Sequence, residues 1–211
     1  TTNGTLLTPH VREWLTERKE DFRVILSVDG DEIMQAENRG CSIADIPIGF
    51  VRDTWEKSYF KMTLSHETLP NYARGVISLS QNGFRIASSL AEGTTWNREE
   101  ALIYRDQLTE IANYFLKNPN VKPEHPFDYI YKELIIGDVT IAKNCGVGTT
   151  IATYDTDGRK YPCHLFLPIV HGNDDYEKIS NLDFTANDSL ITDECVNCPI
   201  VRLCRTCYGY N

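Results

Sequence analysis

The stretch CVNCPIVRLCRTC (residues 195–207) places four thiols within thirteen residues, in the spacing C-x2-C-x5-C-x2-C. Two cysteines separated by two residues can bind one metal centre from a single turn of chain. Tetrahedral sulfur sites suit zinc and iron-sulfur clusters alike, and the spacing does not separate them. The array therefore predicts thiolate ligation, with a zinc ribbon and an iron-sulfur site as the alternatives.

Two further cysteines, Cys145 and Cys163, flank a segment with the pattern of a β-hairpin. The runs TTIATY and RKYPCHLF alternate in polarity about the turn DTDG. A hairpin would return Cys163 toward the strand that begins after Cys145. Six of the seven cysteines then fall into clusters, and the odd total argues against a disulfide-paired secreted protein. We expect metal-bound thiolates in a reducing cytoplasm.

The composition excludes several classes of partner. The chain has 211 residues, 41% of them hydrophobic, and a formal charge of −9. Such an acidic chain lacks the basic patches that nucleic-acid binders use, so we expect no nucleic-acid partner. It also has no apolar run near the roughly 20 residues that a membrane span needs, so we expect no membrane partner.

Upstream of the cysteines, predicted strands and helices alternate. Apolar runs predict strands in residues 22–30, 59–65 and 84–90, with the first ending at Asp29-Gly30. Segments with helical periodicity lie between these strands and after the last one. This strict alternation of strands and helices favours a parallel sheet with crossover helices.

The helix starts carry local signals. Thr8 before Pro9 predicts one N-cap, and Asn97 with Glu100 predicts a capping box. Thr68 is the predicted cap of the helix between the second and third strands.

A proline-rich stretch, KNPNVKPEHPF, marks a boundary. We therefore divide the chain into an α/β part (residues 1–120), a linker with a short helix (residues 121–144) and a cysteine-rich part (residues 145–211).

Two motif sets, in this order, carry a family resemblance. Cys145, Gly158 and Cys163 form C-x12-G-x4-C, and Cys195, Cys198 and Cys204 follow as C-x2-C-x5-C. Together with DGRKYPCH, TNGTLL and ILSVDG, they resemble radical S-adenosylmethionine (SAM) enzymes that have a SPASM extension. The resemblance implies an α/β fold: the C-terminal half of a partial (β/α) barrel, then a small cysteine-rich SPASM extension with a β-hairpin, incomplete at its C-terminus.

The resemblance also implies cluster ligands. Cys145, Cys163 and Cys207 match positions that hold a first auxiliary [4Fe-4S] cluster. Cys195, Cys198 and Cys204 match ligands of a second. The chain departs from the family in having two residues rather than three between Cys204 and Cys207, and in lacking a further downstream cysteine.

The C-x3-C-x2-C motif that holds the SAM-cleaving [4Fe-4S] cluster in this family is absent from these residues. We expect the sequence to represent the middle and C-terminal part of a longer enzyme, inactive by itself.

For SAM binding, the resemblance implies Ser27 at a strand end, with Asn3 and Leu90 as further pocket residues. The alternatives are a turn for Asn3 and core packing for Leu90. Arg39 is interpreted as half of a structural ion pair, and Cys41 as a buried apolar residue.

His164 follows Cys163, where sulfatase-maturing relatives carry an aspartate base. Histidine is a candidate base, with hydrogen bonding to the cluster sulfur as the alternative. The resemblance therefore implies a peptide maturase that installs thioether or other crosslinks through a 5′-deoxyadenosyl radical. Its partners would be a precursor peptide or protein and an electron donor such as flavodoxin or ferredoxin. The alternatives are a sulfatase-maturase-type oxidase and a non-catalytic zinc-binding interaction module.

Overall fold

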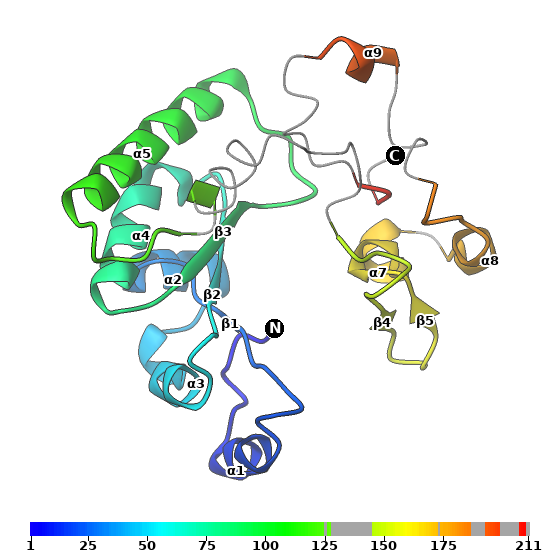
Figure 1. Ribbon diagram of the computed structural model, residues 1–211, viewed down its shortest axis with the longest axis horizontal. Helices are drawn as coiled ribbons and strands as arrows, with labels where there is room; N and C mark the ends of the chain where they lie inside the picture. The colour runs from blue at the N-terminus through cyan, green and yellow to red at the C-terminus, as the bar shows by residue number, and fades with distance from the viewer. Residues whose placement is uncertain (125, 128–144, 173, 187–192, 199–206, 210–211) are drawn as a thin grey trace. The chain divides into compact units, whose positions relative to one another are not determined.

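The computed structural model describes residues 1–124, 126–127, 145–172, 174–186, 193–198 and 207–209 (Figure 1). Its contacts divide the chain into two compact units, Thr1–Tyr131 and Lys132–Asn211. This division falls within the predicted linker of residues 121–144. The helix predicted within that linker lies largely outside the described residues, and the three predicted domain boundaries stay a prediction.

The first unit is built on a parallel sheet. Its strands are β1 (Leu26–Ser27), β2 (Phe60–Leu64) and β3 (Ile86–Leu90), in the order β1-β2-β3. Both strand pairs are parallel, which confirms the predicted mixed α/β fold. The strand predicted for residues 22–30 is shorter than expected, because Phe22 N–H donates to Arg18 O at 3.1 Å and closes a turn instead.

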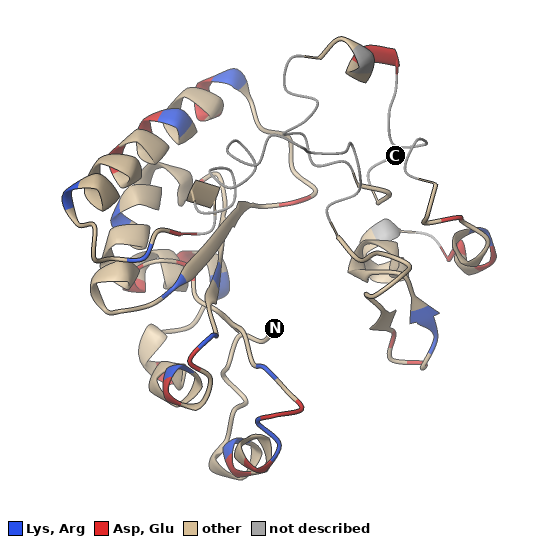
Figure 2. Ribbon diagram, in the orientation of Figure 1, with Lys and Arg blue, Asp and Glu red and all other residues tan. Residues whose placement is uncertain are grey.

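Helices connect and follow these strands. They are α1 (Pro9–Glu17), α2 (Glu32–Arg39), η1 (Ile43–Asp45), α3 (Ile48–Thr54), η2 (Leu69–Asn71), α4 (Tyr72–Gln81) and α5 (Arg98–Lys117). In Figure 1, α4 and α5 lie on the same side of the sheet. Figure 2 shows basic and acidic residues interspersed along α5, as expected of an amphipathic helix with one solvated face.

Two of the three predicted caps form. The Thr8 hydroxyl accepts from Val11 N–H, and Asn97 and Glu100 make the reciprocal capping box at the start of α5. The predicted cap at Thr68 is wrong. Its hydroxyl accepts from Ser65 N–H at 2.9 Å, so it closes the turn after β2, and a 3-10 turn precedes α4.

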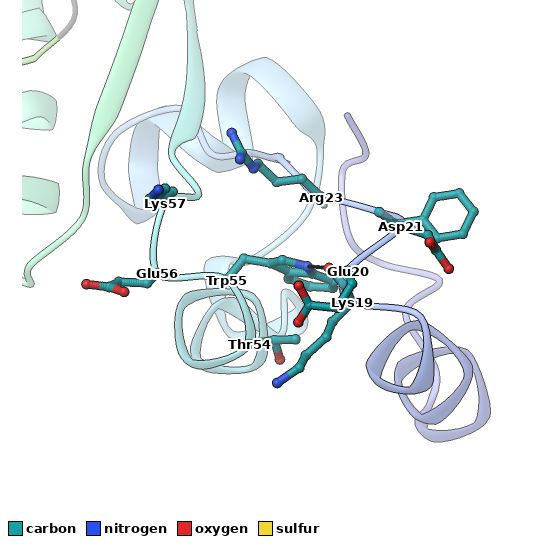
Figure 3. Close-up of a pocket in the computed structure, with 9 residues that line it drawn as sticks. Lys19, Glu20, Asp21, Arg23, Thr54, Trp55, Glu56 and Lys57 are labelled. Carbon is teal, nitrogen blue, oxygen red and sulfur yellow. Dashed lines mark hydrogen bonds between the residues drawn. The ribbon is translucent and has the colours of Figure 1, made fainter.

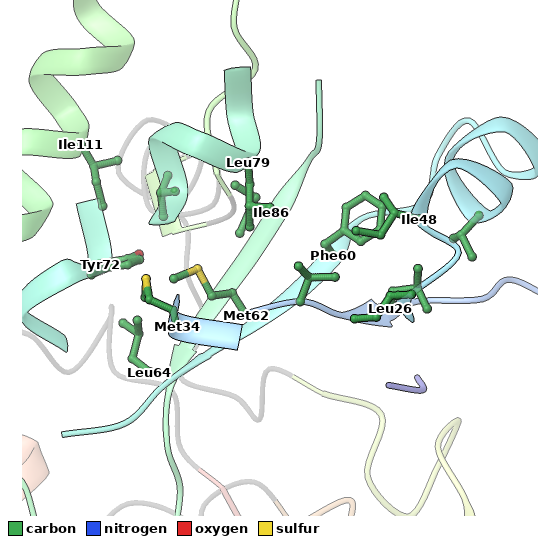
Figure 4. Close-up of a cluster of buried hydrophobic side chains, with 14 of the residues drawn as sticks. Leu26, Met34, Ile48, Phe60, Met62, Leu64, Tyr72, Leu79, Ile86 and Ile111 are labelled. Carbon is green, nitrogen blue, oxygen red and sulfur yellow. The ribbon is translucent and has the colours of Figure 1, made fainter. Parts of the chain in front are cut away.

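One face of the sheet is apolar and forms the main core (Figure 4). Phe60, Met62 and Leu64 are buried at alternate positions of β2, as the two-residue period of a strand requires. Gly75 of α4 packs closely here, since a Cβ at this position would lie 3.0 Å from the Cα of Gly30. Helix α4 therefore meets the turn between β1 and α2 at backbone contact distance.

The second unit contains the predicted hairpin. Strands β4 (Thr153–Tyr154) and β5 (Lys160–Tyr161) pair antiparallel, and Gly158 takes the positive φ of 85° that the turn requires. Short helices follow: η3 (His164–Phe166), α7 (Pro168–His171), α8 (Tyr176–Ser180) and α9 (Asp193–Val196). A separate small core holds this unit together, formed by Val147, Tyr161, Phe166, Ile179 and Phe184.

Along the described residues, no helix is both long enough and apolar enough to cross a membrane.

Candidate functional site

The face of the sheet opposite the main core carries small and polar side chains. Strand register sets Ser27 beside Lys61, and Lys61 beside Ala87. Thr63 and Ser89 form the next row, and alternation places all five on one face. We call Ser27, Lys61, Thr63, Ala87 and Ser89 the polar face. Because parallel α/β folds bind ligands at the carboxyl ends of their strands, this face and its carboxyl edge form the candidate site.

Ser27 lies where β1 ends and is 7% exposed. Its backbone N–H donates to Thr2 O at 2.9 Å, which adds the start of the chain to the sheet beside β1. Asn3, the next residue after Thr2, therefore lies at the same edge of the sheet. Its side-chain oxygen accepts from Thr5 N–H at 3.3 Å and from the Thr5 hydroxyl at 3.1 Å. These contacts match the alternative in which Asn3 forms a turn.

Leu90 lies on the other face of the sheet. It is paired with the buried Leu64 and packs against the main core. This placement favours the core-packing alternative. A role for Ser27, Asn3 or Leu90 in SAM binding stays a prediction.

A buried carboxylate fixes the carboxyl edge between β1 and β2. Asp29 is 1% exposed, and Arg39 Nε lies 2.7 Å from its Oδ2. Thr63 N–H donates to Asp29 Oδ1 at 2.8 Å, and Asn38 Nδ2 donates to Thr63 O at 2.8 Å. The ion pair interpretation of Arg39 is confirmed. It supports a rigid edge next to Ser27, because a buried charge persists only when it is paired and hydrogen-bonded.

A second polar cluster at this edge was not predicted from the sequence. His66 follows β2, and its Nδ1 hydrogen-bonds Glu100 Oε1 in the first turn of α5. Its Nε2 lies 2.6 Å from the hydroxyl of Thr94, which follows β3. The ring centroid is 4.5 Å from that of Trp96. Because these partners are distant in sequence, the only local signal is that His66 follows a predicted strand.

In the second unit, several groups affect the predicted ligand Cys163. Burial raises the pKa of the Cys163 thiol, and charge on Cys207 and Cys145 raises it further. Hydrogen bonds from the backbone of Leu165 and Phe166 lower this pKa, since N–H donors favour a thiolate. Such donors are also what a thiolate bound to iron requires.

The tail array is described in part. Cys195 and Cys198 are half-buried, and Cys198 N–H donates to Cys195 O at 3.1 Å, so both lie on one turn. Cys204 lies outside the described residues. Within the described part of the chain, no three His, Cys, Asp or Glu side chains are arranged as a metal-ligand group. The assignment of these thiols as cluster ligands therefore stays a prediction.

His164 is exposed and begins η3, next to Cys163. An exposed ring in this position is accessible to a substrate. Its proposed role as a base stays a prediction.

Comparison with known proteins identifies the fold. No protein-family model matches the chain, and no curated protein matches it. Among solved structures, the chain has the fold of radical SAM enzymes. The solved structures that it matches include those of anSMEcpe, an anaerobic sulfatase-maturating enzyme.

The native enzyme with bound AdoMet is 18% identical, with a TM-score of 0.65 over 98% of this chain and 64% of that chain. The native enzyme with bound AdoMet and a Kp18Cys peptide is 17% identical, with a TM-score of 0.65 and the same coverage. The chain thus spans less than two thirds of the length of these structures. The predicted α/β fold with a parallel sheet is confirmed and is consistent with a partial radical SAM barrel, whereas the SPASM extension stays a prediction.

Proposed function

We propose that this chain belongs to a radical SAM enzyme that modifies a peptide or protein, and that it contributes part of the SAM site and the ligands of auxiliary clusters. The observation that carries the proposal is the polar face, with Ser27 at the carboxyl end of β1. The shared fold supports it, because the matched anSMEcpe structures hold AdoMet and, in two cases, a peptide as well.

At the proposed SAM site, Ser27 would make the most direct ligand contact, because it lies at the carboxyl end of β1. Its hydroxyl would hydrogen-bond the amino-acid end of SAM, and Asn3 would line the same edge. The Asp29–Arg39 ion pair would hold the neighbouring backbone in place. Bound SAM supplies radical chemistry in this family, whereas the residues described here bind and orient it.

In the second unit, residues 145–211 would form the cluster domain, joined to the barrel part by residues 121–144. Cys145, Cys163 and Cys207 would hold one auxiliary cluster, and Cys195, Cys198 and Cys204 would hold most of the other. The backbone donors next to Cys163 support this role, since hydrogen bonds to sulfur stabilise the thiolate. A cluster at these sites would bind substrate or pass an electron.

The substrate would be a precursor peptide or protein, and the product would carry a thioether or another crosslink. A sulfatase-maturase-type oxidation is the second candidate, favoured by the identity of the matched structures. In either reaction His164 would act as the base, and a flavodoxin or ferredoxin would supply electrons in the cytoplasm.

The SAM site is tested with Ser27→Val, with Ser80→Val as the matched control. Both serines are 7% exposed, but Ser80 lies in helix α4 rather than on the polar face. A hydrogen bond to a charged group contributes about 1.5 to 3 kcal/mol, so SAM affinity should fall about ten-fold or more in Ser27→Val. The measurement is equilibrium SAM binding. Equal SAM affinity in the two variants would show that Ser27 does not contact SAM.

The clusters are tested by anaerobic reconstitution, followed by assays of iron, acid-labile sulfide and zinc. Cys163→Ala should lose the iron of one cluster. The control variant is Cys41→Ala, which removes a thiol from the first unit, where the Cys41 sulfur accepts from Gln35 Nε2 at 3.3 Å. This variant should keep all of its iron. Stoichiometric zinc without sulfide would contradict the proposal and favour the zinc-binding interaction module.

A further inference from the structure

Basic residues gather at the amino ends of the strands, at the edge opposite the proposed SAM site. Arg23 precedes β1, Lys57 precedes β2, Arg85 directly precedes β3, and Lys122 follows α5. Arg23 and Lys57 are labelled in Figure 3, on the segments leading into the first two strands. All four line one hollow of about 440 Å³, together with Tyr59, Ile86 and Ala87.

The sheet itself brings these side chains together. Phe60 N–H donates to Arg85 O at 2.7 Å, which extends the β2–β3 ladder to the start of both strands. The register that pairs Phe60 with Ile86 places Tyr59 beside Arg85. Successive parallel strands start at the same edge, so residues that precede them converge. The hollow therefore rests on a paired sheet rather than on a free loop.

Most of the positive charge in this hollow has no acidic partner in the described lining. None of the described residues that line the hollow is acidic, although the chain as a whole has a formal charge of −9. Among the described contacts, Arg23, Lys57 and Lys122 make no ion pair, whereas several arginines elsewhere pair with a carboxylate. Basic groups concentrated in a concave site raise the local concentration of anions.

We propose that this hollow binds a small molecule that carries two or more phosphate groups. Guanidinium groups hold phosphate oxygens in a planar fork, and lysine ammonium groups add point charges, so Arg23, Lys57 and Lys122 together suit adjacent phosphates. The volume is within the range of small-molecule sites. Tyr59 adds an aromatic ring to the lining. The hollow shares Ala87 with the polar face, but it uses none of the residues at the carboxyl edge where SAM binding is proposed.

The experiment is calorimetric titration of the full chain with sodium triphosphate at low ionic strength. The test variant is Lys57→Gln with Lys122→Gln. The control variant is Arg98→Gln with Lys117→Gln, which removes the same charge from exposed positions of α5 outside the hollow. We expect the test variant to lose triphosphate affinity about ten-fold or more, and the control variant to change much less. Thermal unfolding midpoints confirm that both variants fold.

Three outcomes would overturn the proposal. The first is no triphosphate binding by the unmodified chain. The second is an equal loss in the two variants, because this would reflect net charge alone. The third is tighter binding of an acidic peptide than of triphosphate, which would make the hollow a peptide site. None of these outcomes bears on SAM binding, so failure here and failure of the proposed function are distinguishable.

Discussion

Glu124 has a buried carboxyl group, which connects the segment after α5 to helix α4 of the first unit through a hydrogen bond. It is 1% exposed, and the hydroxyl of Tyr72 donates to its Oε1. The same hydroxyl lies 2.5 Å from the Oγ of Ser88 on β3. The ring of Tyr104 stacks on Tyr72, with centroids 5.8 Å apart. Burial raises the pKa of Glu124 from 4.5 to about 7, against the opposing effect of its hydrogen bonds.

This raised pKa makes stability depend on pH in a defined direction. Below pH 4.5 the carboxyl group is protonated in both the folded and the unfolded chain. Between 4.5 and about 7 the unfolded chain loses this proton while the folded chain keeps it, so the free energy of unfolding falls as pH rises. The pKa difference corresponds to a loss of roughly 3 kcal/mol, which is complete above the folded pKa.

Glu124→Gln should remove this dependence, because the amide still accepts from Tyr72 but does not ionise. We expect the variant and the original chain to differ little near pH 4.5, and the variant to be more stable by up to roughly 3 kcal/mol at about pH 8. The measurement is the free energy of unfolding in urea across this range. Glu110→Gln, at an exposed position of α5, is the control. Parallel pH profiles for the Glu124 variant and the original chain would refute the reasoning.

Other predictions concern stability at a single pH, measured by urea unfolding. Met62→Ala should cost about 2 to 5 kcal/mol, because Met62 is fully buried and its loss leaves a cavity; a cost under 1 kcal/mol would contradict the packing described. Asn97→Ala should cost about 1 kcal/mol by removing the capping box with Glu100, and an unchanged midpoint would argue against this cap. Asp29→Asn should cost about 1 to 3 kcal/mol, since it leaves Arg39 without its partner, and it should be rescued little by added salt.

Features set by neighbouring residues were predictable from the sequence. The caps at Thr8 and Asn97 depend on residues three positions away, and both form. The β4–β5 hairpin likewise depends on a local turn. Thr68 shows the limit of this reasoning. Its hydroxyl can accept from the helix that follows it or from the turn that precedes it, and it accepts from Ser65 N–H in the turn.

Features set by distant residues were not predictable. Glu124 lies in a proline-rich stretch typical of a solvated linker, yet Tyr72 and the main core bury it. His66 meets Glu100 only because α5 begins near the end of β2. The basic hollow depends on strand register, which determines that Lys57 and Arg85 lie at one edge. None of these contacts leaves a periodic pattern in the sequence.

The strand pairing also has a consequence for the rate at which the chain acquires its structure. Leu26 pairs with Phe60, and Phe60 pairs with Ile86, so each parallel ladder joins segments with whole helices between them. In the second unit, Tyr154 pairs with Lys160 across a tight turn. Contacts between distant segments require costly loop closure, whereas hairpins form within about 1 to 10 μs. We therefore expect the hairpin to form early in folding, and the polar face to exist only once the slow, high-contact-order sheet has closed.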